Sequence, residues 1–398
     1  MKTSGKLLIT ISLVAISLMV GNVTAQTKKD FNVGYKFSNG LAKIYVNEKY
    51  GFLNREGELA FPCIFDYAND FTNNFSIVRL NDKYGIISIS GLQLVEFDYD
   101  YIESYSNGLA LFKKDGKFGY MNEEGKEVIP ASFDYAMSFS ENLAAVKINN
   151  KYGFIDKKGN IKIQPEYEFL SSFSGDLALI KKDGKFGYIN NKGKIEIAPV
   201  YDQATNFKEG LATVRKDGKS HLINDKNKTI TDFGYESIGP FTNGTAVFSN
   251  NGKYGLINNK GREIINNLDY IEESSEGMLA FELNNRWGFI DNKGTVVIAP
   301  SFERVRGFSH GLAAVAINKK YGFIDNKGKT VVPLMFDYAN DFSEGFACVK
   351  FQNSFIYLNE KGVEKIEISK AIGTQDQLNV KFNESQNGTL ISSIDLYR

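Results

Sequence analysis

The sequence has few of the residues that build metal centres and disulfide frameworks. Only two His and two Cys occur among its 398 residues. A zinc ribbon, an iron–sulfur site or a disulfide-framed mini-protein therefore lacks its ligands, and we expect no metal and no cofactor. Hydrophobic residues at 42% and charged residues at 24% also exclude collagen-like, disordered and multi-span membrane proteins.

Proline is scarce, whereas glycine and aromatic residues are abundant. The chain has 7 Pro, 37 Gly and 13% aromatic residues, which fits poorly with two helical or doubly wound domains. High Gly with many Tyr and Phe indicates short strands joined by tight turns. The composition thus favours an all-β protein.

The N-terminus has the pattern of a secretory signal peptide. Lys2 and Lys6 precede an apolar run over residues 7–20, and Val23-Thr24-Ala25 offers small residues at a signal-peptidase site. The run is shorter than the roughly 20 residues of a bilayer span. We therefore predict a signal peptide over residues 1–25, cleavage after Ala25, and a secreted or periplasmic mature chain without membrane insertion.

The charge of the mature chain argues against polyanionic partners. Removing Lys2 and Lys6 leaves 45 basic and 47 acidic residues, a formal charge near −2. Electrostatic capture by nucleic acid or by an anionic membrane is not supported by this balance.

An aromatic residue followed by Gly recurs along the chain and defines a repeat. The pairs are Tyr50-Gly51, Tyr84-Gly85, Phe118-Gly119, Tyr152-Gly153, Phe186-Gly187, Tyr254-Gly255, Trp287-Gly288 and Tyr321-Gly322. Their spacing is 34 residues, with one step of 33 before Gly288. His221 and Ile356 fall where Gly is expected, so the array has ten units. A helical repeat of this period is excluded because Gly stands inside the element and the apolar positions alternate.

Each unit reads as a meander of three strands. The first strand, as in Gly108-Leu109-Ala110-Leu111-Phe112, is apolar on both faces and is therefore covered on both sides. Its second position is Ala in eight units, which predicts close approach of a neighbouring unit: Ala42, Ala110, Ala144, Ala178, Ala212, Ala246, Ala313 and Ala347.

Turn residues separate the three strands. Pairs such as Asp115-Gly116 suit a type I′ hairpin, and Asp156-Lys157-Lys158-Gly159 resembles a type I turn with a G1 bulge. The third strand alternates, as Ile161-Lys162-Ile163 shows, and several units place Pro at its end. We expect the remaining ten residues to form a short turn or helical loop.

These units resemble the bacterial WG-repeat family, also called KWG repeats. The resemblance covers about residues 37–365 and rests on the aromatic-Gly pair, the following Phe-Ile-Asp and the Gly-Leu-Ala start. Only Trp287-Gly288 keeps the Trp of the family's motif. The family implies β-rich tandem repeats of no generally established biochemical role, and it supplies no catalytic residues.

One meander is too small to bury its apolar faces alone, so neighbouring units must share a core. We predict ten three-stranded units in an open, curved, solenoid-like array, with a closed propeller-like ring as the alternative. Residues 26–36 would form a lead-in, 37–365 the repeats, and 366–398 a C-terminal cap or tail.

Repeated side chains are the first candidates for a binding surface. Nine acids share one repeat position: Asp66, Asp100, Asp134, Glu168, Asp202, Glu236, Asp269, Glu303 and Asp337. A cation or sugar groove is one reading, but we favour acids that open turns and bond backbone N–H groups. The aromatic of each aromatic-Gly pair is read mainly as core. Trp287 is the one ring we single out as a candidate ligand surface.

The remaining reactive residues give weak signals. His221 and His310 belong to no Ser, Cys or carboxylate motif, so we do not expect either to be a general base. Cys63 lies in the first unit and Cys348 in the tenth. In a closed ring they become neighbours, and a disulfide latch is one hypothesis; a buried thiol at Cys348 is the preferred one.

The functional hypotheses follow from repetition. An extended repeated surface suits binding, whereas catalysis needs one unrepeated, convergent polar site. Our leading hypothesis is an exported, non-enzymatic binding or scaffold module for a protein partner. A glycan-binding module is the alternative, and an enzyme with a site off the repeat grid is the least favoured.

Overall fold

The computed structural model describes residues 33–232, 234–272, 275–352, 354–366, 382–385 and 388–391. These residues belong to one compact unit, Phe31–Arg398, and their regular elements are all β-strands. The expected signal peptide, its cleavage site and most of the C-terminal segment 366–398 lie outside the described residues.

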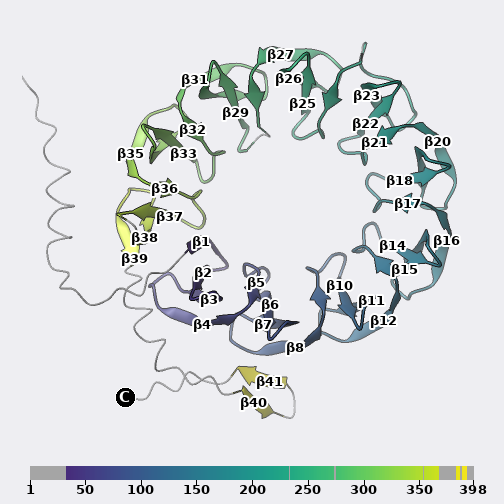
Figure 1. The fold of residues 1–398 in the computed structure, drawn as a ribbon, viewed down its shortest axis with the longest axis horizontal. Helices are drawn as coiled ribbons and strands as arrows, with labels where there is room; N and C mark the ends of the chain where they lie inside the picture. The colour runs from purple at the N-terminus through teal and green to yellow at the C-terminus, as the bar shows by residue number, and fades with distance from the viewer. Residues whose placement is uncertain are drawn as a thin grey trace, which may run out of the picture. The chain divides into compact units, whose positions relative to one another are not determined.

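The described strands form ten consecutive sheets, called blades 1–10, plus a separate two-stranded sheet. Nine blades have four antiparallel strands and blade 6 has three. Figure 1 shows the blades side by side around a ring, with the first strand of each blade at the inner edge and the last at the outer edge.

The strands have the following bounds. Inner strands are β1 (Val33–Ser38), β5 (Tyr67–Ala68), β9 (Tyr101–Ile102), β13 (Tyr135–Ala136), β17 (Phe169–Leu170), β21 (Gln203–Ala204), β24 (Ser237–Ile238), β28 (Tyr270–Ile271), β32 (Arg304–Val305) and β36 (Tyr338–Ala339). Second strands are β2 (Leu41–Val46), β6 (Phe75–Leu80), β10 (Leu109–Lys114), β14 (Leu143–Ile148), β18 (Leu177–Lys182), β22 (Leu211–Lys216), β25 (Thr245–Asn250), β29 (Met278–Leu283), β33 (Leu312–Ile317) and β37 (Phe346–Phe351). Third strands are β3 (Lys49–Leu53), β7 (Lys83–Ser88), β11 (Lys117–Asn122), β15 (Lys151–Asp156), β19 (Lys185–Asn190), β23 (Lys219–Asn224), β26 (Lys253–Asn258), β30 (Arg286–Asp291), β34 (Lys320–Asp325) and β38 (Ser354–Asn359). Outer strands are β4 (Leu59–Phe65), β8 (Gln93–Tyr99), β12 (Glu127–Phe133), β16 (Ile161–Tyr167), β20 (Ile195–Tyr201), β27 (Glu263–Leu268), β31 (Val296–Phe302), β35 (Thr330–Phe336) and β39 (Glu364–Ile366), and β40 (Phe382–Ser385) pairs with β41 (Gly388–Ile391).

The prediction of three strands per unit was wrong by one short strand. In blade 2, Tyr67 and Ala68 of β5 pair with Arg79 and Val78 of β6. These two residues open the connection that we expected to be a turn or helical loop. Two residues are too few to show a period-2 pattern, so this strand has no periodic signal of its own. In blade 1 the inner strand begins at Val33, inside the segment 26–36 that we expected to be a lead-in.

The aromatic-Gly pair is explained by a bulge in the outer strand. Tyr84 pairs with Tyr99 and Ile86 pairs with Val95, so the single residue Gly85 of β7 faces three residues of β8, 96–98. The extra residues of the outer strand bring its backbone close to the glycine of the aromatic-Gly pair. A Cβ on Gly153 of blade 4 would lie 2.5 Å from the Ile163 carbonyl oxygen. Only glycine leaves room for this approach.

Neighbouring blades share their cores. One hydrophobic cluster combines Leu111 and Tyr120 of blade 3 with Phe139 and Val146 of blade 4. All eight alanines at the second position of the second strand are buried. This confirms the expectation that a small side chain there permits close packing of the next unit.

The ring closes, so the expectation of an open array was wrong and the alternative of a propeller-like ring is confirmed. At internal seams a Ser hydroxyl donates to a Phe carbonyl of the next blade, as Ser140 does to Phe173 at 2.8 Å. Between blades 10 and 1 the same bond runs from Ser343 to Phe37 at 2.7 Å. The Tyr357 hydroxyl also donates to the Tyr35 carbonyl at 2.7 Å. The closing seam therefore repeats the internal ones, and none of the described strands is exchanged between the first and last blades.

Candidate functional site

The tight turns between second and third strands lie along one rim of the ring, which we call the turn rim. Asn81 and Asp82 have φ of 51° and 64°, and Asp115 and Gly116 have 49° and 76°. Positive φ at both central residues is the type I′ geometry that the sequence predicts. These turns present Asn, Asp and Gly to solvent on consecutive blades.

The periodic acids hold the turn rim together. Asp100 accepts hydrogen bonds from Lys83 Nζ of blade 2 at 2.7 Å and from the Gly116 N–H of blade 3 at 3.2 Å. The Lys83 ammonium, followed by the Gly116 N–H, lowers the pKa of Asp100 below its ordinary value. The acids thus bond backbone N–H groups as predicted, but the turn they bond belongs to the following hairpin and not to their own segment.

The same arrangement recurs around the ring. A Lys or Arg that begins a third strand pairs with the acid about 17 residues later: Lys49–Asp66, Lys83–Asp100, Lys117–Asp134, Lys185–Asp202, Lys253–Asp269, Arg286–Glu303 and Lys320–Asp337. Because each of these carboxylates is already neutralised by a cation, a repeated cation-binding groove is not what the structure shows. Among the described residues, no three His, Cys, Asp or Glu side chains gather as a metal site requires.

Aromatic rings form a belt of successive contacts that runs from blade to blade. Rings of the aromatic-Gly pairs alternate with rings that begin the inner strands, with centroids 5.2–6.5 Å apart. The contacts are Tyr50–Tyr67, Tyr67–Tyr84, Tyr84–Tyr101, Phe118–Tyr135, Tyr135–Tyr152, Tyr152–Phe169, Phe169–Phe186, Tyr254–Tyr270, Tyr270–Trp287, Tyr321–Tyr338 and Tyr338–Phe355. Most are edge-to-face or tilted. We call these residues the aromatic belt.

The inner-strand members are the more exposed part of the belt. Tyr67, Tyr101, Tyr135 and Tyr270 are 38–42% exposed, whereas the rings of the aromatic-Gly pairs are half-buried. Burial raises the pKa of Tyr67 and of Tyr101 above 10.0, so both hydroxyls stay protonated at neutral pH. In blades 6, 7 and 9 the first residue of the inner strand is not aromatic but Gln203, Ser237 and Arg304, respectively.

Trp287, the ring singled out from the sequence, is one member of this belt. It is half-buried in β30 and packs against the shared core of blades 8 and 9. Its ring meets Tyr270 edge to face at 5.9 Å. Sequence reasoning missed Tyr67, Tyr101, Tyr135 and Tyr270 because they lie in the segment expected to be a loop. The available signal was an aromatic residue 17 positions after five of the eight aromatic-Gly rings, as from Tyr84 to Tyr101.

Basic side chains cover faces of several belt rings. Lys113, Lys147 and Lys181 stand over Phe118, Tyr152 and Phe186 at 5.3–5.5 Å from the ring centroids. Each of these Lys residues is the cross-strand partner of its ring. Cation–π contact therefore occupies part of the aromatic surface that an external ligand would use.

Neither histidine is part of a catalytic arrangement in the described residues. His221 replaces the glycine of blade 6, and its Nδ1 lies 3.4 Å from the Thr231 hydroxyl. His310 sits in a turn, where its backbone N–H donates to Glu276 and its Nδ1 lies 3.2 Å from the Phe342 carbonyl oxygen. Both fit structural roles.

Cys63 and Cys348 are buried in one cluster at the closing seam. Closure brings the two residues into the same core, as the ring alternative required, but they are thiols and no disulfide joins them. Burial raises the pKa of each thiol to about 12.

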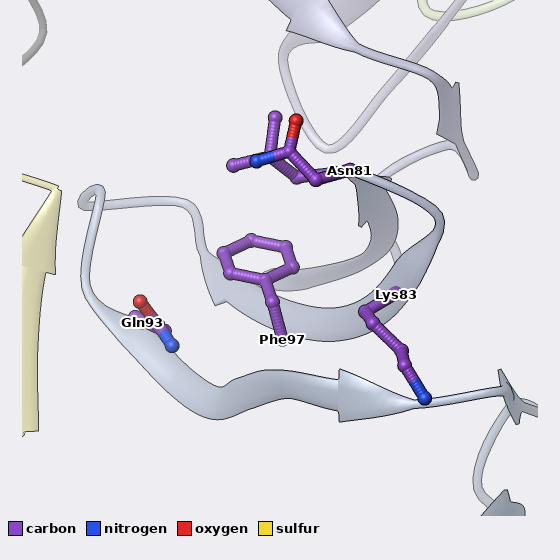
Figure 2. Close-up of a pocket in the computed structure, with 5 residues that line it drawn as sticks. Asn81, Lys83, Gln93 and Phe97 are labelled. Atoms are coloured by element: carbon purple, nitrogen blue, oxygen red, sulfur yellow. The ribbon is translucent and has the colours of Figure 1, made fainter.

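A shallow pocket opens on blade 2 between the hairpin turn and the outer strand. It has a volume of about 210 Å³ and is lined by Leu80, Asn81, Lys83, Gln93 and Phe97. Figure 2 shows the Phe97 ring between Asn81 and Gln93. Phe97 stands where other blades have Pro165 or Pro199, and its ring covers Gly85. The one charged group, Lys83, is held by Asp100, so the pocket has no acid–base pair.

Several solved structures show a weak similarity to this chain. A eukaryotic initiation factor shares 12% identity over 85% of this chain and 100% of its own, with a TM-score of 0.48. BamB from Moraxella catarrhalis shares 13% identity over 66% and 95% of the two chains, with a TM-score of 0.36. PorZ, a surface component of the type-IX secretion system of Porphyromonas gingivalis, shares 10% identity over 84% and 59%, with a TM-score of 0.27.

The family comparison is more specific. No curated protein matches the sequence. The described residues contain no helix of the length and hydrophobicity that a bilayer crossing needs. The family model for the WG containing repeat matches nine consecutive segments: residues 50–84, 84–118, 118–152, 152–186, 186–219, 222–254, 254–287, 287–321 and 321–354. These segments cover most of the chain, and the protein therefore belongs to the WG-repeat family.

Proposed function

We propose that this protein is an exported, non-enzymatic binding or scaffold module that presents its turn rim to a protein partner. The observation that carries the proposal is the exposure of Tyr67, Tyr101, Tyr135 and Tyr270 beside polar hairpin turns. Tyrosine combines a large apolar ring with a hydrogen-bonding hydroxyl, and it is enriched at protein interfaces. Blades 2, 3, 4 and 8 repeat this combination along one rim.

Neighbouring rings and cations cover part of the aromatic ring faces, which favours a protein partner over a sugar. Ring faces that would stack on a pyranose are partly taken by edge-to-face neighbours, as between Tyr84 and Tyr101. Other faces are covered by cations such as Lys147 over Tyr152. The inner-strand tyrosines are nevertheless exposed to solvent, and tyrosine side chains suit irregular protein contacts.

A glycan-binding module is the second candidate function. The exposed inner-strand Tyr270 and the indole of Trp287 lie in one continuous stretch of ring contacts with Tyr254. If a polysaccharide is the ligand, the purified ring binds it in a polysaccharide screen, and Trp287→Ala removes that binding. An enzyme with a site off the repeat grid remains the least favoured proposal.

Export is part of the proposal. It rests on the N-terminal pattern Lys2, Lys6, the apolar run 7–20 and Ala25. The near-neutral charge of the mature chain supports a partner other than nucleic acid. N-terminal sequencing of the secreted product tests the location and the expected start at Gln26.

The binding test uses two matched variants of the mature chain. In the first, Tyr67, Tyr101, Tyr135 and Tyr270 are each replaced by Ser. In the control, three outer-strand residues of similar exposure, Ile161, Ile195 and Val296, are each replaced by Ser. A partner is captured from the exported fraction, identified, purified and titrated against all three proteins. We expect at least tenfold weaker binding for the tyrosine variant only; equal affinity for all three contradicts the proposal.

A further inference from the structure

Blade seams carry a second repeated contact on the rim opposite the turn rim. There the chain makes a two-residue turn immediately before each second strand. The first residue of each turn has positive φ, as in Glu209 and Glu276 at 52° and 50°. The ten residues at this position are Asn39, Asn73, Asn107, Glu141, Gly175, Glu209, Asn243, Glu276, His310 and Glu344. We call it the cap position.

Where the cap position holds Glu, its carboxylate accepts hydrogen bonds from backbone N–H groups in the corresponding turn of the next blade. Glu276 accepts hydrogen bonds from the N–H groups of His310 at 2.7 Å and Gly311 at 2.9 Å. Glu209 accepts from the N–H groups of Asn243 and Gly244, both at 2.8 Å. Two adjacent backbone N–H groups thus form a receptor for one carboxylate.

The seam between blades 5 and 6 has the receptor without the carboxylate. Its cap position is Gly175, and nothing lies within 4 Å of where a Cβ would stand. Among the described residues, the facing N–H groups of Glu209 and Gly210 have no hydrogen-bond acceptor. A pocket of about 300 Å³ opens at this seam, lined by Ser174, Gly175, Phe207, Lys208, Glu209, Gly210 and Asp225.

Two of the other polar groups of this pocket are already hydrogen-bonded, and one is not paired with an opposite charge. Ser174 Oγ is engaged with the Phe207 carbonyl at 2.6 Å, and Lys208 Nζ reaches away to Thr242 Oγ1 at 2.9 Å. Asp225 makes no ion pair within the described part of the chain and is exposed. The pocket therefore has the negative charge of Asp225 and the two N–H donors of Glu209 and Gly210.

The closing seam shows how a cation fits this geometry. Arg55 occupies the repeat position of Asp225, five units earlier, and its guanidinium contacts the capping carboxylate of Glu344 at 2.8 Å. Glu344 simultaneously accepts from the Gly40 N–H at 2.9 Å. Compared with the closing seam, both charges differ at the blade 5–6 seam, because Gly175 stands in place of the acid Glu344 and Asp225 in place of the base Arg55. A ligand that restores the balance brings a carboxylate and a cation together.

We propose that the pocket between blades 5 and 6 binds a small zwitterion of the α-amino-acid type. Its carboxylate accepts from the N–H groups of Glu209 and Gly210, as protein carboxylates do at other seams. Its ammonium group lies between that carboxylate and Asp225. The site is on the rim opposite the aromatic belt and is independent of the partner surface proposed above.

The test uses glycine as the zwitterion, acetate as the carboxylate alone and glycinamide as the cation alone. Each is titrated into the ¹⁵N-labelled mature chain while backbone amide resonances are followed. We expect glycine to shift the Glu209 and Gly210 resonances, and acetate to do so about two- to fivefold more weakly, the range an exposed ion pair gives. Glycinamide is expected to leave them unmoved. Unchanged Glu209 and Gly210 resonances in 100-fold excess glycine overturn the proposal.

Two variants separate the contributions of the groups. Gly175→Glu restores the internal cap and is expected to abolish binding of glycine and acetate; Glu adopts the same positive φ at four other seams, so the chain still folds. Asp225→Asn is expected to reduce glycine binding to the level of acetate. As a gain-of-function control, Glu276→Gly exposes the His310 and Gly311 N–H groups, whose resonances then shift with acetate. Retained glycine binding in Gly175→Glu contradicts the site.

Discussion

His221 and Gly234 have exchanged the roles that other blades give to the third and outer strands. In blade 6 the third strand β23 carries an imidazole where Gly is expected, and the facing segment supplies a glycine instead. A Cβ on Gly234 would lie 2.9 Å from His221 Nε2 and 2.6 Å from Lys219 Cβ. The close approach of the two backbones is therefore kept, but in blade 6 the glycine that permits it is Gly234 and not a residue of β23.

This exchange predicts a coupled response to mutation. Gly234→Ala should destabilise the ring by about 1–3 kcal/mol through overpacking. In a His221→Ala background the same change should cost about 0.5–1 kcal/mol less, because the imidazole of His221 is gone while Lys219 Cβ remains. Urea unfolding of the wild type, both single variants and the double variant measures the coupling. Strictly additive effects would show that the two residues do not contact.

The aromatic-Gly pair gives a second prediction, for the glycine. Gly153→Ala places a methyl group 2.5 Å from the Ile163 carbonyl oxygen and 2.8 Å from Pro165 N. Backbone must move, and we expect a loss of about 1–3 kcal/mol or more. Gly239→Ala is the control, because its Cβ would meet only the Val247 carbonyl oxygen at 3.4 Å. A change within about 0.5 kcal/mol is expected there; similar losses at both positions would refute the bulge explanation.

Sequence periodicity was enough to find ten units, their three long strands and the packing role of residues such as Ala144. It was not enough to find the two-residue inner strand at Tyr67, because so short an element has no periodicity of its own. Closure depends on the small rotation between adjacent blades, which no local pattern encodes. The same holds for the candidate surface: Trp287 stood out by identity, whereas Tyr101 and Tyr135 became visible only when the loop segment proved to line the ring.

The ion pairs of the turn rim predict sensitivity to acid. Cationic Lys partners, assisted by backbone N–H groups, hold the pKa of Asp66, Asp100 and Asp269 below the ordinary value of 3.8. A carboxyl whose pKa is lower in the folded state stabilises the fold above the unfolded value. That contribution disappears as pH falls from 3.8 through the lowered folded value.

Urea unfolding between pH 7 and pH 2 tests this expectation. These carboxylates should leave stability unchanged above about pH 5 and reduce it below about pH 4. Replacing Asp66, Asp100 and Asp269 together by Asn should make the acid limb shallower. An acid limb of the same steepness in the triple variant would assign acid unfolding to other groups.

The two buried thiols should be unreactive in the folded ring. Burial raises the pKa of Cys63 and Cys348 to about 12, so almost no thiolate exists at pH 8. We expect iodoacetamide to leave both unmodified in buffer and to alkylate both in urea without reductant. Intact-mass measurement counts the adducts. A chain that takes up no adduct in urea until it is reduced would instead contain the disulfide latch.

The closing seam should contribute as much stability as an internal one. Ser343 Oγ donates to the Phe37 carbonyl at 2.7 Å, and Ser140 Oγ donates to the Phe173 carbonyl at 2.8 Å. Replacing either Ser by Ala leaves a carbonyl without its donor and should cost about 1 kcal/mol. If the chain were an open array, Ser343 would lie at a free end and its replacement would have no effect. Equal shifts of the urea midpoint for Ser343→Ala and Ser140→Ala therefore establish closure in solution, whereas a loss confined to Ser140→Ala would place the first and tenth blades apart.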